Sequence, residues 1–206
     1  MNVFILSTGR CGSVTFSKAC KYISNYSSGH EERSRLLGND RIDFPKNHIE
    51  IDSRLCWFLG RLEKKYGDDA FYVHLKRDRK KVAESYDKRW FKITGIMDAY
   101  TRGIVMSEDR NLKYCYDYVD TVNENIEAFL KNKSKKTIIN IENIQEDFKT
   151  FWTMIEAEGD LEQALASFEI KHNATTTKSQ LKTKYAKHSH KLVRAFKAFP
   201  LFLKNV

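Results

Sequence analysis

The chain opens with an apolar strand, Asn2-Val3-Phe4-Ile5-Leu6, that runs directly into Ser7-Thr8-Gly9-Arg10-Cys11-Gly12-Ser13-Val14-Thr15-Phe16. A strand that ends in a glycine-containing turn and continues as a helix forms a seat for an anion. The glycines let backbone N–H groups face inward, and the first turn of the helix adds unpaired donors. Arg10, Ser13 and Thr15 add a cation and two hydroxyl groups. The alternative is a helix N-terminus that carries glycine and serine without a ligand.

The residues missing from this turn narrow the kind of anion. A nucleoside triphosphate loop has the pattern G-x-x-x-x-G-K-[ST], whose lysine and hydroxyl serve the phosphates and magnesium. Here Gly9 and Gly12 are three residues apart, no lysine follows Gly12, and the cation precedes the second glycine. The dinucleotide pattern G-x-G-x-x-G is also absent. A nucleotide or nucleoside kinase is therefore kept only as an alternative function.

Two stretches together resemble the PAPS-dependent sulfotransferases. Arg10-Cys11-Gly12-Ser13 is similar to the family's phosphosulfate-binding loop, in which a basic residue, a small residue, glycine and serine or threonine follow one another. Residues 71–85 resemble the family's 3'-phosphate segment: a strand, Arg77-Asp78, a helix, and Ser85 eight residues after the arginine. The two matches occur in the right order along the chain. The resemblance implies a sulfotransferase that moves a sulfuryl group from PAPS to a hydroxyl or amine, with PAP as product.

The resemblance also implies roles for individual residues. Arg77 and Ser85 would bind the 3'-phosphate, and the loop would bind the phosphosulfate through Gly9, Arg10, Cys11, Gly12, Ser13, Val14 and Thr15. Most cytosolic members carry lysine at the position of Arg10. Because a guanidinium does not readily give up a proton, we expect Arg10 to stabilise charge on the bridging oxygen, a contact whose loss costs about 2–4 kcal/mol of barrier. The mechanism requires no metal.

A base must take the proton of the acceptor, and three residues are candidates. Glu31 and His30 lie where several carbohydrate and bacterial sulfotransferases carry their base, and Glu31 is the first choice. His48 is the third, because Lys46-Asn47-His48 is similar to the lysine and histidine arrangement of the cytosolic enzymes. The expected acceptor is a small molecule or a carbohydrate.

The order of predicted elements favours a single α/β domain of three layers, α/β/α, around a mostly parallel sheet. Apolar patterns predict strands over residues 2–6, 48–52, 71–75 and 137–141 and helices over residues 14–26, 53–66, 79–90 and 109–130, with a further helix after the last strand. Residues 33–45 and 92–108 are expected near the substrate opening. The cofactor-binding core would span about 1–155, followed by a basic segment at about 169–206. Members of the family often close the 3'-phosphate and adenine with a C-terminal basic loop of pattern G-x-x-G-x-x-K. This pattern is absent here, and Lys171 and Lys178 are the candidates for the role of that loop.

Composition bounds the remaining possibilities. A net charge of +9 over 206 residues calls for anionic partners, and a basic nucleic-acid-binding module is the third hypothesis. The cations are dispersed, however, and no nucleic-acid recognition motif accompanies them, so no nucleic-acid partner is expected. The four cysteines have neither metal-ligand spacing nor the density of a disulfide framework, and His188 and His190 have no partner pair. With no long apolar run or signal peptide, we expect a cytoplasmic protein without a membrane contact.

Overall fold

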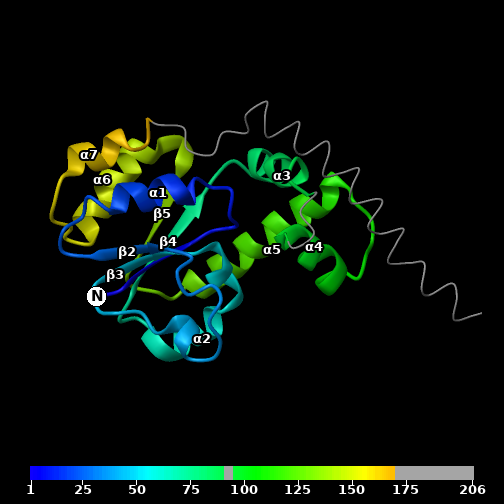
Figure 1. The fold of residues 1–206 in the computed structure, drawn as a ribbon, viewed down its shortest axis with the longest axis horizontal. Coiled ribbons are helices and arrows are strands. Elements are labelled where there is room, and N and C mark those ends of the chain that lie inside the picture. The colour runs from blue at the N-terminus through cyan, green and yellow to red at the C-terminus, as the bar shows by residue number, and fades with distance from the viewer. Residues whose placement is uncertain (91–94, 170–206) are drawn as a thin grey trace, which may run out of the picture.

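The opening strand lies at the centre of a five-stranded parallel sheet. The computed structural model describes residues 1–90 and 95–169. Strands β1 (Val3–Leu6), β2 (Ser27–His30), β3 (His48–Ile51), β4 (Phe71–Lys76) and β5 (Lys136–Asn140) are arranged in the order β2-β3-β1-β4-β5, and every neighbouring pair is parallel (Figure 1). Because the strands are parallel, their carboxyl ends meet at one edge of the sheet, where open α/β folds bind their ligands.

Helices cover both faces of this sheet. Helices α1 (Ser13–Cys20), α6 (Ile144–Met154) and α7 (Leu161–Ala166) lie on one face, and α2 (Leu59–Tyr66) and α5 (Leu112–Leu130) lie on the other (Figure 1). Helices α3 (Arg79–Asp87) and α4 (Ile96–Ala99) pack along α5 at one end of the molecule. The predicted three-layer α/β/α architecture is confirmed.

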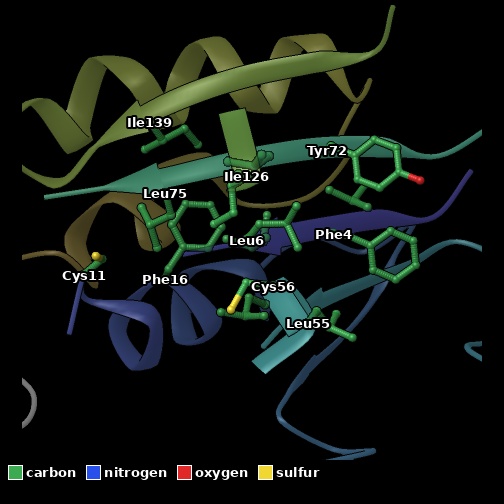
Figure 2. Packing of buried hydrophobic residues seen from close by; sticks show 14 of the residues in the cluster. Phe4, Leu6, Cys11, Phe16, Leu55, Cys56, Tyr72, Leu75, Ile126 and Ile139 are labelled. Carbon is green, nitrogen blue, oxygen red and sulfur yellow. The ribbon is translucent and has the colours of Figure 1, made fainter. Parts of the chain in front are cut away.

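The core explains why β1 is central. All four residues of β1 are at most 1% exposed, because helices cover the strand from both sides. On the α2 and α5 face Phe4 stacks on Tyr72 with ring centroids 5.9 Å apart (Figure 2). On the opposite face the ring centroids of Phe16 and Phe148 are 5.3 Å apart. An uninterrupted apolar strand is typical of this doubly covered position.

The structure differs from the prediction on both sides of β3. Ser27–His30 forms the edge strand β2, although its serines and glycine favour a turn; pairing with β3 overrides that local preference. The single helix predicted over residues 53–66 divides into a 3-10 helix, Ser53–Trp57, and α2. The cap of the 3-10 helix is Asp52, which accepts the N–H of Arg54 at 2.7 Å. These changes shape one wall of the candidate functional site.

Other segments have the predicted type of secondary structure but different bounds. Helix α1 ends at Cys20, and Ile23 pairs with Gly159 in an isolated bridge, so the helix predicted to residue 26 is shorter. The region predicted as a short helix or loop contains α4 and a π-helical turn, Tyr100–Ile104. Short 3-10 helices occur at Asp40–Ile42 and Ile141–Asn143. In the parts of the chain that the structure describes, none of the helices combines the length and the apolar character needed to cross a membrane.

Candidate functional site

The turn after β1 has a backbone that ordinary residues rarely adopt. Gly9, Arg10 and Gly12 all have positive φ angles, of 78°, 62° and 81°. For Arg10, which carries a Cβ, this conformation is strained, and such strain clusters at functional sites. Helix α1 then begins with Gly12 as its N-cap, without a side-chain cap and without an acidic residue in its first turn. Its first-turn N–H groups therefore have no acceptor within the helix and face the end where an anion is favoured.

Hydrogen bonds from neighbouring elements fix the turn. The carbonyl of Thr8 accepts the hydroxyl of Tyr86 on α3 at 2.5 Å and that of Tyr118 on α5 at 3.1 Å. The N–H of Gly9 donates to Ser7 Oγ at 3.1 Å, so this amide is already engaged. Cys11 is buried, donates to the Gly9 carbonyl at 3.3 Å, and has a pKa raised to about 11 by burial. The thiol of Cys11 thus stays protonated and supports the loop from inside.

The two segments that resemble the sulfotransferases meet at this turn. Nε of Arg10 donates to Ser85 Oγ at 3.1 Å, and Nη1 of Arg77 donates to the carbonyl of Arg10 at 2.9 Å. Asp78, the neighbour of Arg77, accepts the N–H of Lys81 at 2.8 Å and so caps α3 instead of pairing with the arginine. Across residues 1–90 and 95–169, no carboxylate forms an ion pair with Arg10 or Arg77.

A cavity of about 380 Å³ opens beside the turn, which is within the usual size range of small-molecule sites. The loop and the start of α1 form one wall, the end of β2 and the 3-10 helix after β3 form the second, and α3, α4 and α5 form the third. Its lining consists of Gly9, Arg10, Ser13, Val14, His30, Glu31, Ser53, Arg54, Trp57, Tyr86, Arg89, Trp90, Gly95, Ile96, Met97 and Tyr118. The cavity therefore combines cations near the turn with a large share of aromatic and apolar surface.

Positive charge gathers at the turn side of this cavity. Burial and the nearby charges of Arg89 and Arg77 lower the pKa of Arg10. Burial also raises the pKa of Tyr86 and of Tyr118, so both phenols remain neutral hydrogen-bond donors to the loop. A group of arginines held close together without neutralising carboxylates at Arg10 and Arg77 favours a ligand with negative charge.

Two of the three candidate bases line the cavity. His30 lies at the end of β2, and its Nε2 is 3.2 Å from Ser13 Oγ in the first turn of α1. Glu31 follows it with a φ of 56°, and its Oε2 is 2.5 Å from Nη1 of Arg54. His30 is therefore in direct contact with the start of α1, whereas Glu31 is held in an ion pair at the cavity wall.

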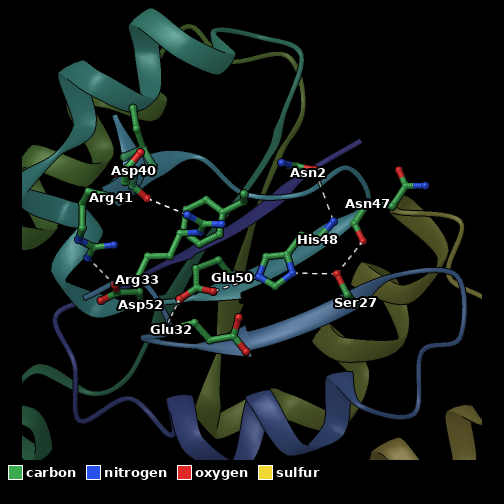
Figure 3. A network of polar contacts seen from close by, with 12 residues as sticks. Asn2, Ser27, Glu32, Arg33, Asp40, Arg41, Asn47, His48, Glu50 and Asp52 are labelled. Carbon is green, nitrogen blue, oxygen red and sulfur yellow. Dashed lines mark hydrogen bonds and ion pairs between the residues drawn. The ribbon is translucent and has the colours of Figure 1, made fainter. Parts of the chain in front are cut away.

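His48 lies apart from this site. Its ring is buried between Ser27 Oγ, 2.8 Å from Nδ1, and Glu50 Oε2, 3.1 Å from Nε2 (Figure 3). His48, Glu50 and Glu32 could in principle hold a metal ion, because one ligand atom of each lies within 4.8 Å of the others. Neither His48 nor the two glutamates line the cavity. The hydrogen bonds instead give His48 a structural role between β2 and β3.

The other residues predicted to belong to the site either lie near the cavity without lining it or fall outside the residues that the structure describes. Cys11, Gly12, Thr15, Arg77 and Ser85 do not line it, although Arg77 and Ser85 contact Arg10. A Cβ on Gly12 would lie 2.7 Å from Ile141, so this glycine is also required for packing. Lys171, Lys178, His188 and His190 lie outside the described residues. A scan of the sequence against models of protein families gives no match, and a search of curated proteins gives no significant match.

Sequence reasoning missed part of the cavity wall. Four lining residues come from segments predicted as helices without a functional role: Trp57, Arg89, Trp90 and Tyr118. One signal was available: Tyr118 follows Cys115 by three residues and shares the buried face of α5. The expectation that residues 92–108 lie near the opening agrees with the position of Gly95, Ile96 and Met97 in the lining.

Proposed function

We propose that this protein is a PAPS-dependent sulfotransferase, which moves a sulfuryl group to a hydroxyl or amine of an acceptor bound in the cavity. The observation that carries the proposal is the meeting of the two resembling segments: Arg77 donates to the carbonyl of Arg10, and Arg10 donates to Ser85. A nucleotide with phosphate groups at both its 5' and 3' positions needs two anion sites within the length of one nucleoside. The loop, together with Arg77 and Ser85, supplies cations and hydroxyls within that reach.

The donors available suit the two anionic ends of PAPS. The first turn of α1 offers N–H groups and the hydroxyls of Ser13 and Thr15 for the phosphosulfate. Arg77 and Ser85 offer charge-assisted and neutral hydrogen bonds for the 3'-phosphate. No lysine follows Gly12, which is where a triphosphate loop needs one. The donor set is therefore better matched to a phosphosulfate than to the triphosphate of a kinase substrate.

We propose His30 as the base, ahead of Glu31, and the contacts at the cavity support this choice. His30 lies against Ser13, close to the loop, whereas one carboxylate oxygen of Glu31 is engaged by Arg54. His30 takes the acceptor proton while the acceptor oxygen or nitrogen bonds to sulfur and the bond between sulfur and the bridging oxygen breaks. Arg10 stabilises the negative charge left on that oxygen, and PAP departs with the electron pair.

The experiment is a transfer assay with radiolabelled PAPS and a panel of hydroxyl and amine acceptors that includes saccharides and phenols. The wild type should release PAP in an acceptor-dependent manner. His30→Gln should reduce turnover by about 10²–10⁴-fold with PAP binding retained, and Glu31→Gln should reduce it less. Normal turnover of His30→Gln combined with a large loss in Glu31→Gln would return the base to Glu31.

The two other functions are tested in parallel by thermal unfolding with PAP, with ATP and magnesium, and with an oligonucleotide. A ligand that binds only the folded protein raises the unfolding temperature. We expect a shift with PAP alone. A shift with ATP and magnesium but not with PAP would indicate a kinase. A shift with the oligonucleotide alone that falls steeply with salt would indicate a nucleic-acid-binding module.

A further inference from the structure

Arg89 stands one helical turn beyond the point where Arg10 contacts α3. Its N–H donates to the carbonyl of Tyr86 at 2.9 Å, so the helical turn continues past the last residue of α3. Arg89 lies in the turn that follows α3, four residues beyond Ser85. The hydroxyl oxygen of Ser85 accepts a hydrogen bond from Nε of Arg10 at 3.1 Å. The chain that leaves α3 thus carries first Ser85, which contacts Arg10, and then Arg89, which lines the cavity.

The arginines around the loop differ in whether they line the cavity. Arg10 and Arg89 line it, together with Ser13 and His30, whereas Arg77 does not. The charge of Arg89 also contributes to the lowered pKa of Arg10, behind the larger effect of burial. Two guanidinium groups held within range of each other repel, and an anion bound between them relieves that repulsion. Arg89 is therefore positioned to act on negative charge inside the cavity.

We propose that Arg89, together with Arg10, binds the sulfuryl group that is transferred. This assignment rests on the proposed sulfotransferase function and adds to it a residue outside the two segments that carry the resemblance. Arg89 donates hydrogen bonds to the sulfuryl oxygens and keeps its proton throughout, because guanidinium is not an acid at neutral pH. In the transfer step, sulfur gains the acceptor atom, the bridging oxygen leaves with the electron pair, and the base takes the proton. Arg77 and Ser85 act on the nucleotide.

The test compares the affinities of PAP and PAPS, which differ only by the sulfuryl group. Both are titrated without acceptor into the wild type, Arg89→Gln, Arg89→Lys and Lys88→Gln. Lys88 is the matched control, because it is the neighbouring cation on the same turn, exposed and outside the cavity lining. Arg89→Gln should weaken PAPS by about tenfold or more and leave PAP within about twofold. Arg89→Lys should retain part of the PAPS affinity, and Lys88→Gln should leave the ratio of the two affinities unchanged.

Retained PAP binding in Arg89→Gln doubles as evidence that this variant is folded. Equal weakening of PAP and PAPS in the two Arg89 variants, or no change in either, would overturn the assignment of Arg89 to the sulfuryl group. A wild type that binds PAP and PAPS while Arg89→Gln keeps their ratio leaves the proposed function standing and removes only this residue. A wild type that binds neither compound overturns the proposed function and this assignment with it.

Discussion

Replacing Gly9 by alanine tests whether the turn after β1 depends on the fit between the loop and α3. The Cβ of an alanine at this position would lie 2.4 Å from the hydroxyl oxygen of Tyr86, a distance that real Cβ atoms do not tolerate. Gly9 also has a φ of 78°, in the left-handed region. The variant therefore combines backbone strain with a clash against a side chain that holds the loop.

The expected loss is the sum of two contributions. A residue with a Cβ in the left-handed region costs about 1–2 kcal/mol. Moving the Tyr86 hydroxyl away from the Thr8 carbonyl costs about 1 kcal/mol, because Tyr118 still donates to that carbonyl. The total is about 2–3 kcal/mol, which corresponds to a fall of about 4–12 °C in Tm for a domain of this size.

The assay is chemical denaturation of matched glycine variants and of Tyr86→Phe. Gly38→Ala isolates the backbone strain, because Gly38 has a φ of 59° and open space around its Cβ position. Gly60→Ala has neither penalty and should stabilise α2 by about 0.5–1 kcal/mol. In the Tyr86→Phe background Gly9→Ala should cost about 1 kcal/mol less than in the wild type. Equal losses in the two backgrounds, or equal losses for Gly9→Ala and Gly38→Ala, would refute the reasoning.

Two further predictions concern buried histidines. Burial lowers the pKa of His74 from 6.5 to about 4, with a smaller opposing effect from its hydrogen bond to Asn123. The unfolded chain therefore binds a proton before the folded chain does, and stability should fall by up to about 3 kcal/mol as the pH drops from about 6.5 to about 4. The free energy of unfolding, measured across this pH range, should show this decrease in the wild type but not in His74→Gln. The same pH dependence in both proteins would contradict the burial argument. His48→Gln should lose about 1–3 kcal/mol of stability but keep turnover; normal stability with lost turnover would show that His48 is the base.

The sequence predicts the fold well where one local signal dominates. The apolar residues of β1 and β4 are buried on both faces, and the long amphipathic pattern forms α5, as predicted. Strand β2 was not predicted, since Ser27, Ser28 and Gly29 lack strand propensity and are ordered by pairing with β3. Gly29 also lies opposite Glu50, where a Cβ would come within 2.7 Å of the Glu50 carboxylate. That requirement depends on tertiary contacts and leaves no local pattern.

In the candidate site, too, some residues could be predicted from the sequence and others depend on tertiary packing. Arg10 and Arg77 each follow the carboxyl end of a predicted strand, and the parallel topology brings both to the same edge of the sheet. The third wall of the cavity comes from the ends of helices whose placement depends on packing against α5. Arg89 and Trp90 follow α3 without a motif of their own, so their position in the lining was not readable from spacing.

The measurement that tests the central claim most directly is a titration of PAP into the wild type, Arg77→Ala and Lys80→Ala. Lys80 is an exposed cation on the same helix and controls for the loss of one positive charge. If the loop and Arg77 bind one nucleotide together, the wild type binds PAP saturably, Arg77→Ala weakens it by about 10–100-fold, and Lys80→Ala changes it little. Equal PAP affinities in the wild type and Arg77→Ala, or no saturable binding of PAP to the wild type, would contradict the claim.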